Sequence, residues 1–211
     1  MLTWLSTLLL FLSAYAAGCF TTGYYLVRWR RKGMDLREFH SRSAGARNTG
    51  RILGRAGFLA AFVGDAGKGA AIIWIARLLS VDARILPWLV PLAVAGHIWP
   101  AQLGFRGGKG LVTALGGMLA LDIRFGMVGL LLYGLPRLHA RGRLLSGIAT
   151  MIILPWLPFP AWNPFQAAAL GVAGAMVLFA HRAHLRNPES RTGEVHPSPN
   201  GSGMHPGKAI R

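Results

Sequence analysis

The sequence is poor in acidic residues, in charge overall and in cysteine. Only seven of its 211 residues are Asp or Glu, against 23 Lys or Arg, and charged residues make up 14% while 53% are hydrophobic. The single cysteine, Cys19, excludes a disulfide framework and a cysteine-rich metal site. So little charge, together with several long apolar runs, argues against a soluble domain. It predicts an all-α, polytopic membrane protein.

The net charge of +16 would suggest a nucleic-acid partner if the chain were soluble. The cations instead lie in segments between apolar runs and not on one polar face, so we expect no nucleic-acid partner. Most of the Lys and Arg residues fall in the segments 28–55, 106–109, 137–143 and 182–211. Positive segments face the cytoplasm. About seven crossings, with the N-terminus outside and the C-terminus cytoplasmic, place these four segments on that side. The first basic cluster follows the first apolar run, which favours an uncleaved span over a signal peptide.

The apolar runs define the expected crossings. One membrane-embedded domain is expected over residues 1–186, followed by a polar, disordered tail over residues 187–211. The run 111–136 is interrupted at Asp122-Ile123-Arg124, and each half is too short for a straight crossing of about 20 residues. Two short tilted helices or a re-entrant hairpin both fit this run. The expected spans are residues 2–27, 56–80, 85–103, the two halves of 111–136, 144–157 and 165–180.

A glycine-rich basic loop follows the third expected span. Its glycines leave backbone N–H groups unshielded and permit positive φ, so with two cations it suits an oxyanion such as phosphate. The alternative is a plain turn whose cations only mark the cytoplasmic side. A nucleotide P-loop is excluded, because Leu103 and Gly110 replace the first Gly and the final Ser or Thr of that motif. The loop reads Gly104-Phe105-Arg106-Gly107-Gly108-Lys109-Gly110.

A second candidate anion site lies in the segment 40–51, which holds hydroxyls, small residues and three arginines. Arg47 and Arg51 are four residues apart, so a short helix would put both on one face. There the two guanidinium groups could bind a phosphate. The alternative is a basic loop beside anionic lipid headgroups.

Four polar side chains fall inside or at the end of apolar spans. Asp65 and Lys68 are three residues apart and can pair, either as a structural pair or as part of a site. His181 and His184 share a helix face at the inner end of the last span. They are either ordinary polar residues at a helix end or residues of the site. With no carboxylate near these histidines, we expect no metal.

Taken together, the motifs resemble those of the bacterial PlsY-type acyl-phosphate:glycerol-3-phosphate acyltransferases, over roughly residues 15–194. The resemblance implies an enzyme of the bacterial cytoplasmic (inner) membrane that needs no cofactor. Such enzymes transfer a fatty acyl group from acyl phosphate to the sn-1 hydroxyl of glycerol 3-phosphate, which gives lysophosphatidic acid and phosphate for phospholipid synthesis. The matching residues are Ser41…Gly45-Ala46…Asn48…Arg51, Gly64-Asp65…Lys68-Gly69, Gly96-His97…Pro100, Gly104 to Gly110 with Thr113, and His181-Arg182.

Carried over by position, the resemblance also implies site residues. The catalytic ones are Ser41, Arg51, Lys109 and His181. The candidate substrate-binding residues, which come partly from the charge and spacing of the segments described above, are Arg47, Asn48, Arg106, Gly107, Gly108, Gly110, Ser146 and His184. The hypothesis is that Lys109, Arg106 and the loop N–H groups hold one phosphate while Arg47 and Arg51 hold another.

The chain departs from the family pattern in its first motif. His40-Ser41-Arg42-Ser43 replaces the usual Gly-Ser-Gly-Asn, and Arg47 stands where Thr is common. The expected partners are acyl phosphate, glycerol 3-phosphate and membrane lipids, with the oligomeric state open. Two alternatives are a transporter of a phosphorylated small molecule and an inactive homologue acting as a membrane scaffold. A transporter should show a repeat between its halves, and the sequence shows none.

Overall fold

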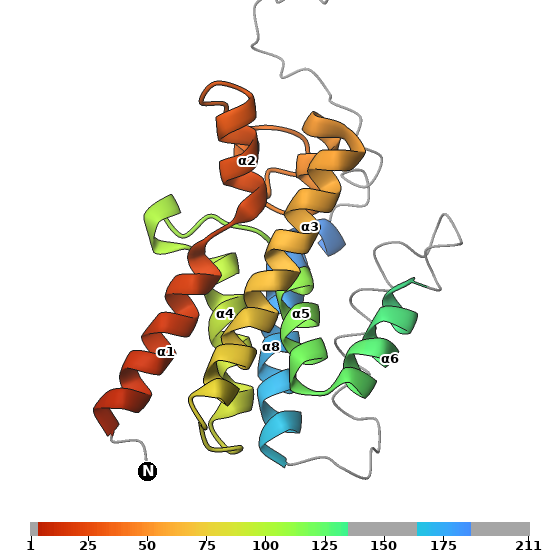
Figure 1. The fold of residues 1–211 in the computed structure, drawn as a ribbon. Helices are drawn as coiled ribbons and strands as arrows, with labels where there is room; N and C mark the ends of the chain where they lie inside the picture. Colours follow the sequence, from red (N-terminus) through yellow and green to blue (C-terminus); the bar gives the residue numbers. More distant parts are fainter. Residues whose placement is uncertain (1–3, 135–163, 187–211) are drawn as a thin grey trace, which may run out of the picture.

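The computed structural model describes residues 4–134 and 164–186, which form helices joined by turns and contain no strand (Figure 1). The prediction of an all-α protein is confirmed for these residues. The expected span over residues 144–157, Ser146 within it and the expected tail over residues 187–211 lie outside the described residues.

The first expected span, residues 2–27, is divided into two helices, α1 (Trp4–Cys19) and α2 (Thr22–Arg30). The break has a tertiary cause. The Phe20 carbonyl accepts a hydrogen bond from Lys68 Nζ at 2.6 Å, and the Cys19 carbonyl accepts one from Gln102 Nε2 at 2.7 Å. Side chains of other elements therefore satisfy carbonyls that a continuous helix would have satisfied itself.

The second expected span is part of a longer helix, α3 (Ala46–Leu78), which begins ten residues before the predicted start at residue 56. Gly54, at φ 71° and ψ −165°, interrupts its helical geometry; this region of φ is open to glycine and strained for other residues. The short helical segment before Gly54 carries Arg47 and Arg51, so the predicted short helix is present.

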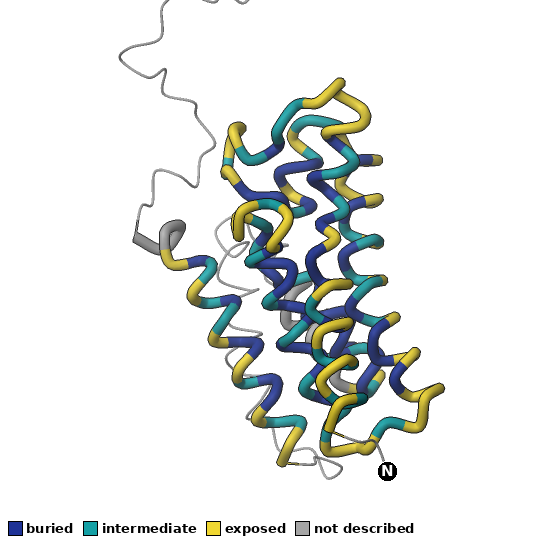
Figure 2. The backbone as a smooth tube through the Cα atoms, turned by 90° about the vertical axis from the view of Figure 1, so that its left-hand side faces the viewer, coloured by how far each residue is buried: buried dark blue, intermediate teal, exposed yellow. Residues whose placement is uncertain are grey.

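Helix α4 (Leu89–Ile98) lies at the centre of the bundle, between single 3₁₀ turns at Leu86–Trp88 and Ala101–Leu103. Its ten residues rise about 15 Å, which is half the thickness of the hydrocarbon core, about 30 Å. The expected span 85–103 is thus shorter as a helix than predicted. Eight of the ten residues are buried, and a helix that is apolar on every side belongs inside a bundle. Over the described residues, the buried positions lie on the inner sides of the helices and the exposed ones on the outer faces and at the ends (Figure 2).

The run 111–136 contains two helices, α5 (Leu111–Leu121) and α6 (Ile123–Gly134), and the chain reverses direction between them (Figure 1). Asp122 is extended, at φ −156°, and its carboxylate accepts hydrogen bonds from the backbone and guanidinium of Arg124. The interruption predicted at this acidic–basic pair is confirmed. The last helix, α8 (Pro164–Arg186), includes the expected span 165–180.

Three helical segments in the described part of the chain are long and apolar enough to cross a membrane: residues 4–30, 46–78 and 164–182. Their outer faces leave large apolar side chains exposed, where a water-soluble surface would be polar. Among these side chains are Leu8, Leu12, Leu59, Val63 and Trp74. Helix α2, the start of α3 and the loops that join them gather at one end of the bundle (Figure 1). The protein is a multi-pass membrane protein.

Candidate functional site

The glycine-rich loop is fastened to the end of α4 by its own backbone. Gly107 N donates to the Ile98 carbonyl at 3.0 Å, and Gly108 N donates to the His97 carbonyl at 2.9 Å. These two N–H groups therefore point into the protein. The amides of Lys109 and Gly110 make no hydrogen bond within the described residues. Together with the first turn of α5, they are the N–H groups left for an anion.

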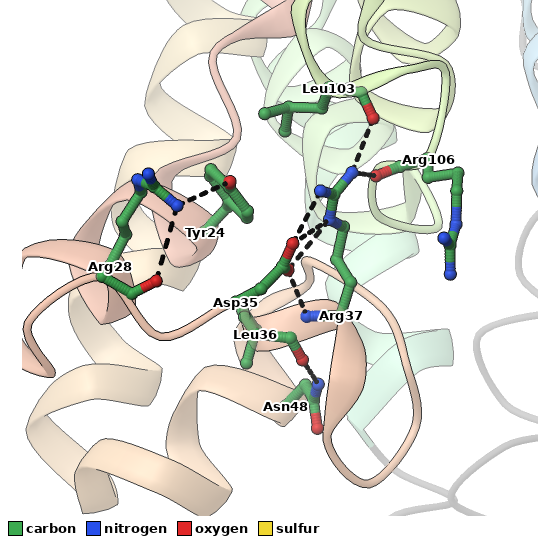
Figure 3. A network of polar contacts seen from close by, with 9 residues as sticks. Tyr24, Arg28, Asp35, Leu36, Arg37, Asn48, Leu103 and Arg106 are labelled. Atoms are coloured by element: carbon green, nitrogen blue, oxygen red, sulfur yellow. Dashed lines mark hydrogen bonds and ion pairs between the residues drawn. The ribbon is translucent and has the colours of Figure 1, made fainter.

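The loop over residues 31–45, which joins α2 to α3, is tied to the glycine-rich loop. Ala44 N donates to the Gly107 carbonyl at 3.1 Å. Arg37 Nη1 donates to the carbonyls of Leu103 at 2.6 Å and Arg106 at 3.1 Å (Figure 3). The two candidate anion segments, which are far apart in sequence, thus form one unit.

Arg37 owes its position to Asp35, whose carboxylate accepts hydrogen bonds from Arg37 Nε at 3.0 Å and Nη2 at 2.7 Å. These bonds lower the pKa of Asp35. The guanidinium also lies over the Tyr24 ring, 5.0 Å from its centroid. With most of its donors so occupied, Arg37 joins the two loops to each other. In the sequence Arg37 is one of many basic residues in the segment 28–55, and only the Asp-x-Arg spacing of Asp35 and Arg37 hints at this local pair.

Asn48 organises the loop around Ser41 and is 1% exposed. Its amide nitrogen lies 3.0 Å from each of three backbone carbonyls, those of Leu36, Phe39 and Ser43. Its side-chain oxygen accepts a hydrogen bond from Ser41 N at 3.4 Å. The sequence predicts a substrate contact for Asn48, but the structure engages its amide with the loop backbone.

Three cations form what we call the cation cluster: Arg47, Arg51 and Lys109. Arg47 and Arg51 are exposed on the first turns of α3, and Lys109 is half-buried in the glycine-rich loop. Burial, followed by the positive charges of Arg47 and Arg51, lowers the pKa of Lys109 from 10.5 to about 8. None of the ion pairs among the described residues involves these three side chains. Within residues 4–134 and 164–186 the cluster is therefore a positive region without a paired acidic side chain, and such a region attracts anions.

His181 is buried near the end of α8, and its Nδ1 lies 2.7 Å from the Val177 carbonyl. Because a carbonyl only accepts, Nδ1 is the donor in this contact and carries a proton. His184 follows on the same helix, but its side chain lies outside the described part of the structure.

A cavity of about 210 Å³ lies between the end of α8, the end of α4 and the glycine-rich loop. Most of its lining side chains are apolar, and they are joined by the backbone of Gly108 and by Arg182. The lining residues are Ile98, Trp99, Gly108, Phe179, Ala180 and Arg182. The structure thus brings the end of α8, which carries the His181-Arg182 motif, beside the glycine-rich loop. No group of three or more His, Cys, Asp or Glu that could hold a metal occurs in the part of the chain that is described.

Comparison with known proteins adds a family to this geometry. A family model described as glycerol-3-phosphate acyltransferase matches residues 8–188. Glycerol-3-phosphate acyltransferase 1 of Desulfitobacterium hafniense (strain Y51) is 41% identical over 183 residues, which cover 85% of this chain and 89% of the relative. The glycerol-3-phosphate acyltransferase of Synechococcus elongatus is 36% identical over 206 residues, which cover 90% and 96%.

Two solved structures are similar in fold. Both are of PlsY, described as an integral membrane glycerol 3-phosphate acyltransferase. Its glycerol 3-phosphate form matches with a TM-score of 0.79 and 29% identity, covering 88% of this chain and 93% of that one. Its lysophosphatidic acid form matches with a TM-score of 0.78 and 28% identity over the same shares.

Proposed function

We propose that this chain, which belongs to the glycerol-3-phosphate acyltransferase family, acylates glycerol 3-phosphate for phospholipid synthesis with acyl phosphate as its donor. Relatives carry the acyltransferase name, and one solved neighbour is a glycerol 3-phosphate form. The observation that carries the donor is the pairing of two cationic segments through the Ala44–Gly107 hydrogen bond. A reaction between two phosphate-bearing substrates needs two adjacent anion sites.

In the proposed reaction the two sites hold the two phosphates. Lys109, Arg106 and the free N–H groups before α5 bind one, and Arg47 and Arg51 bind the other. Gly107 and Gly108 shape the loop through their bonds to α4, and Gly110 starts α5 in a left-handed conformation. Binding both phosphates side by side brings the hydroxyl to the acyl carbon.

The chemistry needs little else from the protein. The substrate hydroxyl oxygen bonds to the acyl carbon, the bond from that carbon to the phosphate oxygen breaks, and inorganic phosphate leaves. The hydroxyl proton passes to a phosphate oxygen or to Nε2 of His181, which can act as a base or only as a hydrogen-bond acceptor. Ser41 hydrogen-bonds substrate in this account. Among the described residues it has no His–carboxylate pair that would make it a nucleophile. Ser146 and His184 are proposed to contact the acceptor.

For the topology, we propose seven crossings with the N-terminus outside and the C-terminus cytoplasmic, in the bacterial inner membrane. One domain over residues 1–186 precedes a polar tail over residues 187–211. The gathering of the segments 28–55 and 106–109 at one end of the bundle supports this orientation, because positive segments stay on the cytoplasmic side.

The test is acyl transfer by the purified protein in detergent, from palmitoyl phosphate to labelled glycerol 3-phosphate. Labelled lysophosphatidic acid and inorganic phosphate are expected in equal amounts. Product formed only from an acyl thioester would overturn the proposed donor. Binding of glycerol 3-phosphate without product would indicate a scaffold. Uptake of unchanged glycerol 3-phosphate into proteoliposomes would indicate a transporter.

A further inference from the structure

Three motif residues have no part in the proposed reaction, yet they form a buried cluster of ionisable side chains between α3 and α4. Asp65 on α3 is 1% exposed and His97 on α4 is 3% exposed. The Lys68 side chain, one turn along α3 from Asp65, is 9% exposed. Buried charge is costly unless it is paired, so each charged group of this cluster needs hydrogen-bond partners.

Each proton of the Lys68 ammonium has an acceptor. Nζ lies 2.6 Å from the Phe20 carbonyl, 3.0 Å from Asp65 Oδ1 and 2.8 Å from His97 Nδ1. Because an ammonium only donates, His97 Nδ1 is the acceptor, and the ring proton is on Nε2. Lys68 thus joins the break between α1 and α2, the middle of α3 and the end of α4.

Asp65 extends the same cluster. Besides Lys68, its Oδ1 accepts a hydrogen bond from Thr22 N, the first residue of α2, at 3.3 Å, and it lies 3.6 Å from His97 Nδ1. The carboxylate balances the ammonium and restricts it to one place. Three helices therefore meet at one ion pair.

His97 connects the ion pair to the glycine-rich loop, because it contacts the loop through both its ring and its carbonyl. A Cβ added to Gly108 would overlap Nε2, Cδ2 and Cε1 of the His97 ring, so the loop backbone lies directly against the imidazole. The His97 carbonyl also accepts the Gly108 N–H at 2.9 Å. Lys109 is the next residue. A rotation of the His97 ring would move the loop that places the Lys109 ammonium.

We infer that Asp65, Lys68 and His97 are positioning residues, which fix the glycine-rich loop at its Gly108 backbone and thereby set the place of Lys109. This inference rests on the proposed function of the loop. Stability alone is a weak explanation for the cluster, because apolar side chains of similar volume often stabilise a fold as well as a buried ion pair does.

The first test removes both charges together, with Asp65→Leu and Lys68→Met in one protein, so that no charge is left buried without a partner. We expect a folded protein whose kcat/KM for palmitoyl phosphate falls roughly 10- to 100-fold, since misplacement by about 1 Å can cost that much. The matched control is Arg77→Met. Arg77 lies in the last turn of α3, and its guanidinium donates to the Leu121 carbonyl at 2.6 Å. This variant should lower Tm and leave kcat/KM unchanged.

The second test addresses the contact between His97 and Gly108. Gly108→Ala should abolish most activity by clashing with the ring. In the His97→Asn background the side-chain oxygen can still accept from Lys68, while the part of the ring facing Gly108 is gone. Gly108→Ala should therefore cost at least 10-fold less in kcat/KM there than in wild type. An equal loss in both backgrounds would overturn the contact.

Calorimetric binding of glycerol 3-phosphate and of inorganic phosphate to each variant separates this inference from the proposed function. An active wild type with unchanged kinetics and anion affinity in the Asp65→Leu/Lys68→Met protein would overturn the positioning role and leave the function standing. An inactive wild type whose anion affinity still falls in that variant would overturn the function and support the positioning of the loop.

Discussion

Arg37 and Leu103, 66 residues apart in the chain, are joined by a hydrogen bond of 2.6 Å from Arg37 Nη1 to the Leu103 carbonyl. The bond fastens the loop over residues 31–45 to the start of the glycine-rich loop (Figure 3). Asp35 holds the other edge of the same guanidinium. Together with the Ala44–Gly107 hydrogen bond, this arginine holds the two segments proposed to bind the two phosphates at a fixed separation.

Arg37→Lys should disturb both segments, because a single ammonium cannot reproduce the planar fork that spans Asp35 and two carbonyls. We expect kcat/KM to fall about tenfold, which corresponds to about 1.4 kcal/mol, together with a lower Tm. Arg28→Lys is the matched control, since both hydrogen bonds of Arg28 are 3.5 Å long. If both variants kept wild-type kinetics, the positioning role of Arg37 would be contradicted.

Asn48→Asp should lower stability, because it replaces an amide donor by an anion that faces three carbonyls. Buried groups left unsatisfied cost about 1–3 kcal/mol, so Tm should fall by several degrees and activity should fall with it. Ser41→Ala is the comparison. Only the backbone N–H of Ser41 bonds to Asn48, so this variant should keep its Tm and lose kcat. An Asn48→Asp protein with normal Tm but weaker glycerol 3-phosphate binding would instead support the substrate contact that the sequence predicts.

Sequence reasoning succeeded where the cause of a feature is local. The pair Asp122–Arg124 ends α5 through its own hydrogen bonds, so the interruption is visible in the sequence. The spacing of Arg47 and Arg51 likewise predicts a shared helix face, and that of Asp65 and Lys68 predicts their ion pair, at 3.0 Å.

Features with a tertiary cause were not predictable. Phe20 and Thr21, at the division itself, are neither glycine nor proline; the Lys68 side chain, 48 residues away, donates to the Phe20 carbonyl. The contact of His97 with Gly108 depends on how the loop folds back over α4. His97 is among the residues that match the family, but that match alone gives it no role.

Gly110 and Gly104 offer a test of the loop's shape. Both have positive φ, 77° and 62°, where another residue is strained by about 1–2 kcal/mol. A Cβ at Gly110 would also lie 2.8 Å from Val94 Cγ1, whereas Gly104 has open space around it. Gly110→Ala should therefore raise KM for palmitoyl phosphate and lower Tm more than Gly104→Ala does. Equal effects of the two substitutions would show that packing at the start of α5 does not set the phosphate site.

The lowered pKa of Lys109, about 8, predicts a pH dependence. As pH rises through 8 the free enzyme loses this positive charge, so kcat/KM should fall above pH 8 and stay level between about pH 7 and 8. Phosphate monoesters lose their second proton near pH 6 (pKa about 6), so glycerol 3-phosphate does not change its charge in this range. Lys109→Arg keeps its charge to higher pH and should remove the fall. A fall that persists in Lys109→Arg would assign it to another group.

The central claim, that Lys109 in the glycine-rich loop binds a substrate phosphate, is tested most directly by acyl transfer in Lys109→Ala. The measurement is the labelled lysophosphatidic acid formed from palmitoyl phosphate and labelled glycerol 3-phosphate. The control variant is Arg84→Ala, which removes a cation from the short loop that follows α3. We expect that Lys109→Ala folds normally and loses at least 100-fold in kcat/KM, or about 2.7 kcal/mol, as for a charge that acts on the transition state. Arg84→Ala should keep wild-type activity. Product formation by Lys109→Ala at the wild-type rate and KM would contradict the role of Lys109 in binding phosphate.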